Sequence, residues 1–347
     1  MKSKILKLLL NSEEAVSGQM LCEKLGVSRT AVWKVINQLK EEGYEIEAAQ
    51  NKGYTIKNFP DVLTAAQIES QLMDEDFQIT KDSIVKAVRY YDEIDSTNNE
   101  AKRVAENEDT KDGTLFITEC QTTGRGRRGR NWVSPKGSGI WMTLLLKPQI
   151  PPTSASMLTI VSAIAMVEAI NKALDEASEN AQDAVLDKSS VCGIKWPNDI
   201  VLNGKKICGI LTEMSAEMDY IHFVVIGIGL NVNTMEFDES ISDVASSILK
   251  ETGIKIKRSR LVALFSRSFN RVFETFVKNG DLAGLKESYN DMLLNRDRQI
   301  KAIYSDRTIE GVARGINDVG ELIVDTDEGE IIIRAGEVSV RGLYGYV

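Results

Sequence analysis

Apolar residues in the first 60 positions recur at helical spacing, in stripes separated by turn residues. One stripe, with Ile5 and Leu9, predicts a first helix. A second stripe ends before Gly26, and Ser28 can cap a further helix whose apolar face runs to Leu39. Two helices joined by a short glycine-containing turn are the layout of a helix-turn-helix unit.

After this unit the pattern changes to a two-residue alternation, with Tyr44 and Ile46 before a turn at 51–53 and Tyr54 beyond it. The alternation predicts a small β-hairpin, the wing of a winged helix-turn-helix. If the unit binds DNA, six residues face the grooves and phosphates: Ser28, Arg29, Thr30, Trp33, Lys34 and, on the wing, Lys52. The alternative is a solvated face on a domain that contacts another protein.

A connecting helix is predicted over residues 61–77. Beyond it, a strand ends and a helix begins at Thr97, where Glu100 completes a capping box. Two apolar runs, 113–121 and 137–146, predict buried strands on either side of a basic loop.

A long apolar helix is predicted over 155–174, followed by a polar insertion up to Ser190 and a run of strands. From Arg296 onward, short strands separated by Gly, Asn and Asp turns predict a small β-barrel. The 347 residues therefore form an α+β chain of several domains. We expect a winged helix at 1–60, a linker helix at 61–80, a mixed-sheet domain at 81–295 and the barrel at 296–347.

Composition places the chain among soluble globular proteins, with 43% hydrophobic and 27% charged residues. The net charge is −9, yet residues 1–60 carry nine Lys and Arg against seven Asp and Glu. The apolar run near the N-terminus is short, interrupted by Lys7, and lacks a small-residue cleavage site, so it predicts a helix rather than a signal peptide. No stretch approaches eighteen apolar residues, which predicts a cytoplasmic protein without a membrane partner.

Cysteine and histidine usage disfavours several kinds of site. Cys22, Cys120, Cys192 and Cys208 are widely separated and form no C-x-x-C pair, so neither a zinc site nor a disulfide framework is indicated. The single histidine, His222, lies in an apolar run and is predicted to be a strand residue. Ser-His-Asp and Cys-His catalysis are therefore disfavoured.

The basic loop "TTGRGRRGRNW" at 122–132 allows three interpretations: an RNA-binding tract, a dinucleotide fingerprint or a clamp for an anion. A fingerprint must open a helix, but Pro135, Gly137 and Gly139 follow and forbid one. An RNA-binding tract is longer and repetitive. Glycines that allow close backbone approach, alternating with guanidinium groups that fit phosphate or carboxylate oxygens, favour the clamp. A merely solvated loop is the alternative.

A second motif, "KWPNDIVLNGKKICGILTE", spans residues 195–213. Asn203 and Gly204 are typical of a two-residue hairpin turn, which places Lys206 beside the start of the preceding strand. Three glycines interrupt the predicted strands, which indicates either close approach of a flat ligand or structural bulges: Gly209, Gly227 and Gly229.

Four stretches, "DSTN", "QTTGRGRRGRNW", "KWPNDIVLNGKKICGIL" and "IGIGLNVN", resemble the biotin protein ligase family in order and spacing. With its N-terminal winged helix, the chain is similar to the bifunctional ligases that also repress biotin operons. The resemblance implies a central domain like those of class II aminoacyl-tRNA synthetases and lipoate ligases, and an SH3-like C-terminal barrel. It also implies that biotin and ATP with Mg²⁺ form biotinyl-5′-adenylate, which biotinylates a lysine of a biotin carboxyl carrier protein.

The resemblance also assigns residues. Those implied to bind biotin are Ser96, Thr97, Asn98, Gln121, Gly124, Arg125, Gly126, Arg127, Lys206, Gly227 and Gly229. Those implied to bind ATP are Arg127, Arg130, Trp132, Lys195, Asn198 and Lys206. Arg127, Lys206 and Asp199 are the implied catalytic residues, and Asp199 is also a candidate Mg²⁺ ligand or acceptor of the amine proton.

For regulation, we expect the adenylate-bound chain to form a homodimer along an edge strand such as "GIWMTLLL", and so to place two winged helices on operator DNA. Two rivals remain. Lipoate ligases share the chemistry, although the Gly-Arg loop and the winged helix favour biotin. The other rival is a non-catalytic biotin-sensing DNA-binding regulator, which the presence of Arg127, Asp199 and Lys206 disfavours.

Overall fold

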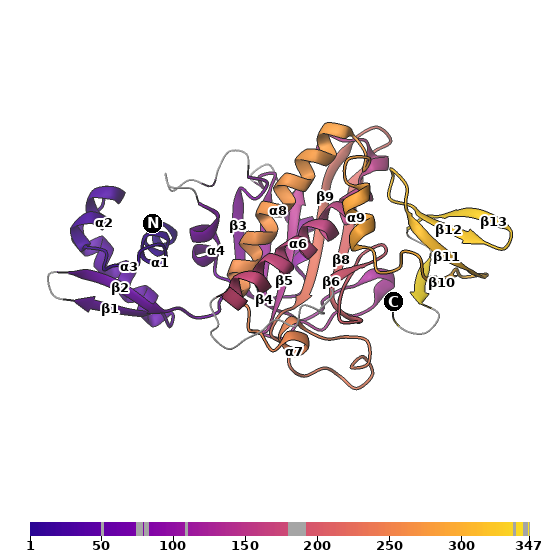
Figure 1. Ribbon diagram of the computed structural model, residues 1–347. Helices are drawn as coiled ribbons and strands as arrows, with labels where there is room; N and C mark the ends of the chain where they lie inside the picture. Colours follow the sequence, from indigo (N-terminus) through magenta and orange to yellow (C-terminus); the bar gives the residue numbers. More distant parts are fainter. Residues whose placement is uncertain are drawn as a thin grey trace.

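The computed structural model describes residues 1–49, 52–73, 79, 83–107, 110–179, 192–335, 338–342 and 346. This part of the chain contains a two-stranded, a seven-stranded and a five-stranded sheet. The two small sheets lie at opposite ends of the central one (Figure 1). The predicted order of winged helix, mixed-sheet domain and small β domain is confirmed, whereas the predicted domain boundaries stay a prediction.

The N-terminal unit has the predicted helix-turn-helix and wing. It comprises α1 (Lys2–Leu10), α2 (Gly18–Leu25), α3 (Arg29–Glu41), β1 (Glu45–Ala49) and β2 (Gly53–Asn58). Ser28 caps α3 because its Oγ accepts a hydrogen bond from the backbone N–H of Ala31. Apolar side chains of the three helices pack with Tyr44 and Ile46 into a core of their own. Asn51 of the predicted turn lies outside the described residues.

The linker carries one short helix, α4 (Ala65–Leu72), which begins after the capping residue Thr64. Tyr44 of the winged helix donates its hydroxyl hydrogen to Gln67 Oε1 at 2.8 Å in a buried contact. The linker helix is therefore hydrogen-bonded to the unit that precedes it. Of the predicted polar insertion, residues 180–190 lie outside the described part of the chain.

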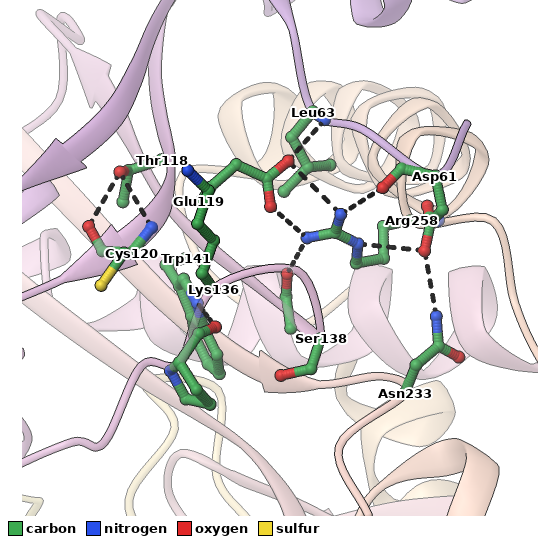
Figure 2. A network of polar contacts seen from close by, with 12 residues as sticks. Asp61, Leu63, Thr118, Glu119, Cys120, Lys136, Ser138, Trp141, Asn233 and Arg258 are labelled. Atoms are coloured by element: carbon green, nitrogen blue, oxygen red, sulfur yellow. Dashed lines mark hydrogen bonds and ion pairs between the residues drawn. The ribbon is translucent and has the colours of Figure 1, made fainter. Parts of the chain in front are cut away.

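A buried arginine joins the linker to the central domain (Figure 2). Arg258 is 1% exposed, and its guanidinium lies 3.1 Å from an Asp61 oxygen and 2.7 Å from a Glu119 oxygen. Glu119 also accepts the backbone N–H of Leu63, and Asn233 donates to Asp61. Since an unpaired buried charge is strongly destabilising, all three ionic partners must stay together.

The central sheet has the strand order β3-β4-β5-β9-β8-β7-β6, with only β3 and β4 parallel among the described pairs. Its strands are β3 (Ala87–Ile94), β4 (Thr114–Gln121), β5 (Gly139–Leu146), β6 (Cys192–Lys195), β7 (Asp199–Leu202), β8 (Lys205–Ala216) and β9 (Ile221–Asn231). The prediction that "GIWMTLLL" forms an edge strand is wrong. It is β5, which pairs with β4 on one side and with β9 on the other.

Helices cover both faces of this sheet. Those of the central domain are α5 (Thr97–Ala105), α6 (Met157–Glu179), α7 (Ile248–Thr252), α8 (Arg258–Asn279) and α9 (Lys286–Met292). Alternate residues of β4 point to opposite faces: Leu115 joins the main core with α6 and α8, and Phe116 joins a smaller cluster with Ala101 of α5. The Gly-Arg loop lies on the same face of the sheet as α5, because Trp132 covers Gly229 and Asn98 of α5 covers Gly227.

Two sequence details need correction. The residue that caps α5 is Ser96, not Thr97, and Glu100 instead accepts the Tyr91 hydroxyl and pairs with Arg103. Thr97 is thereby free for other contacts. The expectation that no segment is apolar enough for a membrane span is also wrong by length and composition, because 152–179 passes that test; 78% of its apolar window is buried inside the protein, as in a core helix.

The C-terminal unit is a five-stranded antiparallel sheet in the order β13-β12-β11-β10-β14. Its strands are β10 (Gln299–Ile303), β11 (Thr308–Ile316), β12 (Leu322–Thr326), β13 (Gly329–Ile333) and β14 (Ser339–Gly342). The Trp196 side chain, just after β6, donates to the carbonyl of Gly320 at 3.0 Å. This contact holds the C-terminal unit against the central sheet.

Candidate active site

A cavity of about 940 Å³ lies where the Gly-Arg loop, β8, β9 and the C-terminal sheet meet. It is lined by every residue that the resemblance assigned to biotin, ATP or catalysis, except Gly124. Gly124 lies behind the cavity wall, where its carbonyl accepts the backbone N–H of Trp132 at 2.9 Å. The tertiary structure thus brings together three separate parts of the chain, within 96–142, 195–245 and 338–346.

The Gly-Arg loop forms a small hairpin rather than an extended strap. Gln121 bridges to Ser134 and Arg125 to Asn131, both antiparallel. At the tip, Arg128 has a φ of 57°, a conformation that few non-glycine residues adopt. Backbone hydrogen bonds therefore hold the loop over the cavity, and an ordering of the loop by its ligand stays a prediction.

Two of the strand glycines lie beneath side chains of the cavity. A Cβ at Gly227 would lie 2.1 Å from Asn98 Oδ1, and a Cβ at Gly229 would lie 2.5 Å from the Trp132 indole. In this structure, the groups that lie close to the backbone at these two glycines are the side chains of Asn98 and Trp132. The Trp132 indole nitrogen is buried and has no hydrogen-bond partner among the described residues.

At one end of the cavity lies a cluster of uncharged polar groups, which we call the neutral end: Thr97, Asn98, Gln121, Ser134 and Thr143. The first three line the cavity, and the last two lie behind them. Gln121 Oε1 accepts from the backbone N–H of Thr97 at 3.0 Å, and Gln121 Nε2 donates to Ser134 at 2.9 Å. The Thr143 hydroxyl lies 2.8 Å from the Thr97 hydroxyl and 2.5 Å from Asn98 Oδ1. These contacts form one continuous hydrogen-bond chain.

The other end is the charged end: Arg127, Lys195, Asp199 and Lys206. Lys206 Nζ lies 2.6 Å from Asp199 Oδ1, as expected from the hairpin at Asn203 and Gly204. The other carboxylate oxygen accepts the Tyr346 hydroxyl at 2.6 Å, and the Lys195 ammonium lies 3.4 Å from the Tyr346 ring centroid. Three cations thus surround one carboxylate.

Burial changes the ionisation of this charged end. It lowers the pKa of Lys195 to about 8, although Asp199 acts in the opposite direction. Burial also lowers the pKa of Arg127, whose guanidinium stays charged and donates to Asn198 Oδ1 at 2.7 Å. Burial and the nearby Asp199 raise the pKa of Tyr346, so this phenol remains a hydrogen-bond donor.

Several cavity residues were not predicted from the sequence. Arg341 and Tyr346 come from the C-terminal unit, and Glu236 and Phe237 from the segment after β9. Neither segment contains a glycine-rich or charged motif that points to a ligand. Only the packing of the C-terminal unit on the central sheet brings Arg341 and Tyr346 to the cavity.

Among the described residues no group of three or more His, Cys, Asp or Glu side chains is placed to hold a metal ion. The single carboxylate of the charged end, Asp199, has both oxygens in contact with Lys206 or Tyr346. Mg²⁺ in nucleotide sites is commonly held by one or two carboxylates together with substrate phosphates. Asp199 would therefore hold a Mg²⁺ that arrives with ATP only after it releases Lys206 or Tyr346.

All six predicted DNA-binding residues are exposed: Ser28, Arg29, Thr30, Trp33, Lys34 and Lys52. The Trp33 side chain is 57% exposed, an unusual position for an indole on a domain surface. Arg29 contacts Gln19 of α2 through its guanidinium at 2.7 Å. The helix and the wing therefore leave a polar face with an exposed aromatic side chain.

Three family profiles match the chain. The Biotin/lipoate A/B protein ligase family matches residues 90–231, an HTH domain matches 2–55, and the Biotin protein ligase C terminal domain matches 297–341. Among solved structures, the biotin protein ligase from Aquifex aeolicus in complex with biotin and ATP superposes with a TM-score of 0.59 at 27% identity. The match covers 74% of this chain and 98% of that one.

Two curated relatives extend over nearly the whole chain. The bifunctional ligase/repressor BirA of Bacillus subtilis (strain 168) is 36% identical over 91% of this chain and 91% of its own length. The bifunctional ligase/repressor BirA of Escherichia coli (strain K12) is 32% identical over 97% of this chain and 96% of its own. The protein described here therefore belongs to the biotin protein ligase family and has the three-part arrangement of its bifunctional ligase/repressor members.

Proposed function

We propose that this chain is an ATP-dependent biotin protein ligase. Biotin and ATP form biotinyl-5′-adenylate, and the biotinyl group then passes to a lysine of a biotin carboxyl carrier protein. The observation that carries the proposal is a single cavity with a neutral end suited to an uncharged ring and a charged end suited to phosphates. The relative solved with biotin and ATP has the same fold at 27% identity.

The first step needs cations because both reactants are anionic. A carboxylate about 4 Å from a phosphate oxygen is repelled by about 4 kcal/mol at an effective dielectric of about 20. Arg127, Lys195 and Lys206 offset this repulsion and stabilise the charge that develops as the carboxylate oxygen attacks the α-phosphorus and pyrophosphate leaves. Mg²⁺, held by Asp199 and the phosphates, would supply further positive charge there.

In the second step the carrier lysine attacks the acyl carbon, an amide bond forms, AMP leaves and the amine loses a proton. Asp199 is the carboxylate of the charged end and serves as the proton acceptor once it is released from Tyr346. The Tyr346 ring lies against the Lys195 ammonium. The ring must therefore move before a phosphate can bind to that side of the ammonium. The Gly-Arg hairpin would shield the mixed anhydride from water until the carrier arrives.

The test is to incubate the full chain with labelled ATP, biotin and magnesium, and to look for a bound acyl-adenylate. Addition of a carrier domain should then discharge the adenylate and biotinylate the carrier. Lipoate in place of biotin is the control and should give no stable adenylate. If the chain binds biotin but releases no pyrophosphate, the rival interpretation, a non-catalytic biotin-sensing regulator, holds instead.

We further propose that the winged helix binds operator DNA, on the strength of its exposed residues Arg29, Trp33 and Lys34. Replacing both Arg29 and Lys34 by alanine should weaken operator binding in gel shifts and reduce the salt slope by about 2, since two phosphate contacts are lost. Lys40→Ala, at the far end of the same helix, is the matched control. An unchanged gel shift for the double variant contradicts the proposal.

A homodimer that forms on adenylate binding is the remaining part of the proposal. It places two winged helices on paired half-sites. Since β5 is interior, the contact must use another surface, and the ends of the described central sheet are β3 and β6. Sedimentation of the chain with and without adenylate tests this; an unchanged mass excludes adenylate-driven dimerisation.

A further inference from the structure

We infer that Glu213 is a positioning residue that makes the Thr97 hydroxyl oxygen a hydrogen-bond acceptor toward the ligand, and that it thereby selects a ring with N–H donors, such as the cyclic urea of biotin, over a dithiolane. This inference rests on the proposed function. Glu213 lies on β8, outside the set of residues that line the cavity, and no ligand contact is assigned to it.

Glu213 fixes the orientation of the Asn98 amide. Asn98 Nδ2 donates to Glu213 Oε2 at 2.8 Å, and the Lys102 ammonium donates to Glu213 Oε1 at 2.8 Å. Although burial acts in the opposite direction, these hydrogen bonds lower the pKa of Glu213, which is therefore ionised. A carboxylate only accepts hydrogen bonds, so the Asn98 NH₂ group must face it and Oδ1 must point the other way.

The orientation of Asn98 sets the direction of the next bond. Asn98 Oδ1 lies 2.5 Å from the Thr143 hydroxyl oxygen, and two acceptors at this distance would repel each other. Thr143 therefore gives its single hydrogen to Asn98. The 2.8 Å contact between the Thr143 and Thr97 hydroxyls then takes its hydrogen from Thr97, for which Gln121 Oε1 at 3.2 Å is the longer alternative acceptor.

Gly227 allows this arrangement because no side chain competes for the space. A Cβ at Gly227 would lie 2.1 Å from Asn98 Oδ1 and 2.8 Å from the amide nitrogen. Asn98 is only 6% exposed and has hydrogen bonds at both ends of its amide. The amide is therefore held in one orientation by Glu213 on one side and Thr143 on the other.

The consequence reaches the ligand through Thr97. Its hydroxyl hydrogen points to Thr143 at 2.8 Å or to Gln121 Oε1 at 3.2 Å, so toward the cavity the Thr97 oxygen has only lone pairs to offer. An N–H of a cyclic urea matches such an acceptor. A dithiolane ring has no N–H and would leave the buried Thr97 oxygen without a donor, which is costly.

The experiment is Glu213→Gln, which keeps the size of the side chain but replaces an acceptor-only group with an amide that also donates. Asn98 is then free to rotate, and Thr97 no longer presents a single polarity. By calorimetry we expect the Kd for biotin to rise about tenfold, with kcat for pyrophosphate release changing less than KM for biotin. Glu217→Gln, the same exchange near the end of the same strand, is the matched control.

Biotin methylated at both ureido nitrogens is the second probe, because it lacks the N–H donors. The unchanged chain should lose much of its affinity for this analogue, whereas Glu213→Gln should discriminate about tenfold less between the two ligands. Glu213→Asp keeps an acceptor-only carboxylate and should retain part of the discrimination between biotin and the methylated analogue. If Glu213→Gln does not fold, Glu213→Asp is the variant to compare with the unsubstituted protein.

Equal losses for biotin and its methylated form in Glu213→Gln would show a merely structural role and overturn the inference. An unchanged Kd for biotin in that variant would do the same while leaving the proposed function intact. If the unchanged chain binds no biotin, the proposed function fails and this inference fails with it.

Discussion

The two ends of the cavity differ in the kind of interaction that they offer a ligand. At the neutral end, Thr97, Gln121 and Thr143 are held by hydrogen bonds of 2.5 to 3.2 Å between uncharged groups. At the charged end, Lys195 and Lys206 face a single carboxylate. Uncharged hydrogen bonds give direction and depend little on pH or salt, whereas the charged groups respond to both. The comparison indicates that ligand selection and activation can be altered separately.

The glycines of β9 mark the border between these ends. Gly227 lies beneath Asn98 of the neutral end, and Gly229 lies beneath Trp132, whose ring is 5.3 Å from the Lys206 ammonium. Successive residues of a strand face opposite sides of the sheet, so Gly227 and Gly229, which are two positions apart, face the same side. A single strand therefore supports both halves of the cavity.

The largest effect should come from Lys206→Ala, which removes a cation from the charged end and leaves Asp199 with its negative charge less compensated. Pyrophosphate release should fall by about 10²–10³-fold, with biotin affinity reduced much less. Lys205→Ala removes the same type of charge from the neighbouring residue, which does not line the cavity, and should retain activity. A Lys206→Ala variant with normal adenylate formation would remove this lysine from the mechanism.

The next largest effect is expected for Arg127→Gly, which removes the hydrogen bond to Asn198 and one cation beside the adenylate. A charge-assisted hydrogen bond of about 1.5–3 kcal/mol corresponds to roughly 10–100-fold faster loss of the adenylate. Released adenylate should biotinylate unrelated proteins, which streptavidin blotting of a mixed lysate detects. Unchanged selectivity for the carrier contradicts this prediction.

Gly227→Ala should sharpen the comparison at the neutral end. The added methyl group overlaps the Asn98 amide, and overpacking of this kind costs about 1–3 kcal/mol of unfolding free energy. Biotin affinity should fall more than ATP affinity, because Asn98 belongs to the neutral end. Gly229→Ala, which displaces Trp132, should show the reverse order, and thermal unfolding of both variants checks the stability cost.

The smallest effect concerns pH. Lys195 is charged below its pKa of about 8 and neutral above it, so KM for ATP should rise a few-fold between about pH 7 and 9, while biotin affinity changes less. Because this pKa is below the unfolded value of about 10.4, the contribution of Lys195 to stability is present above that value and is lost as pH falls through about 8. The Lys195→Arg side chain stays charged over this pH range, so the rise of KM for ATP with pH should disappear. If the rise persists in this variant, a group other than Lys195 causes it.

Local chemistry made much of the molecule predictable. Ser28 and Gly26 are capping and turn residues whose preferences depend on their own backbone, so the helix-turn-helix could be derived directly. Asn203 and Gly204 both have positive φ, which few residue types accept, and the hairpin that places Lys206 followed from them. The cap of α5 was missed by one residue because Ser96 and Thr97 have the same local preference.

The amino-acid sequence by itself determined the order of the three units, the hairpin of the charged end and a set of candidate active-site residues, all of which except Gly124 line the cavity. Only the tertiary structure decided that β5 is interior, that Asn98 and Trp132 lie over the strand glycines, and that Tyr346 reaches Asp199. The physical reason is range: caps and turns depend on neighbouring residues, whereas strand order and side-chain contacts depend on packing between segments far apart in the chain.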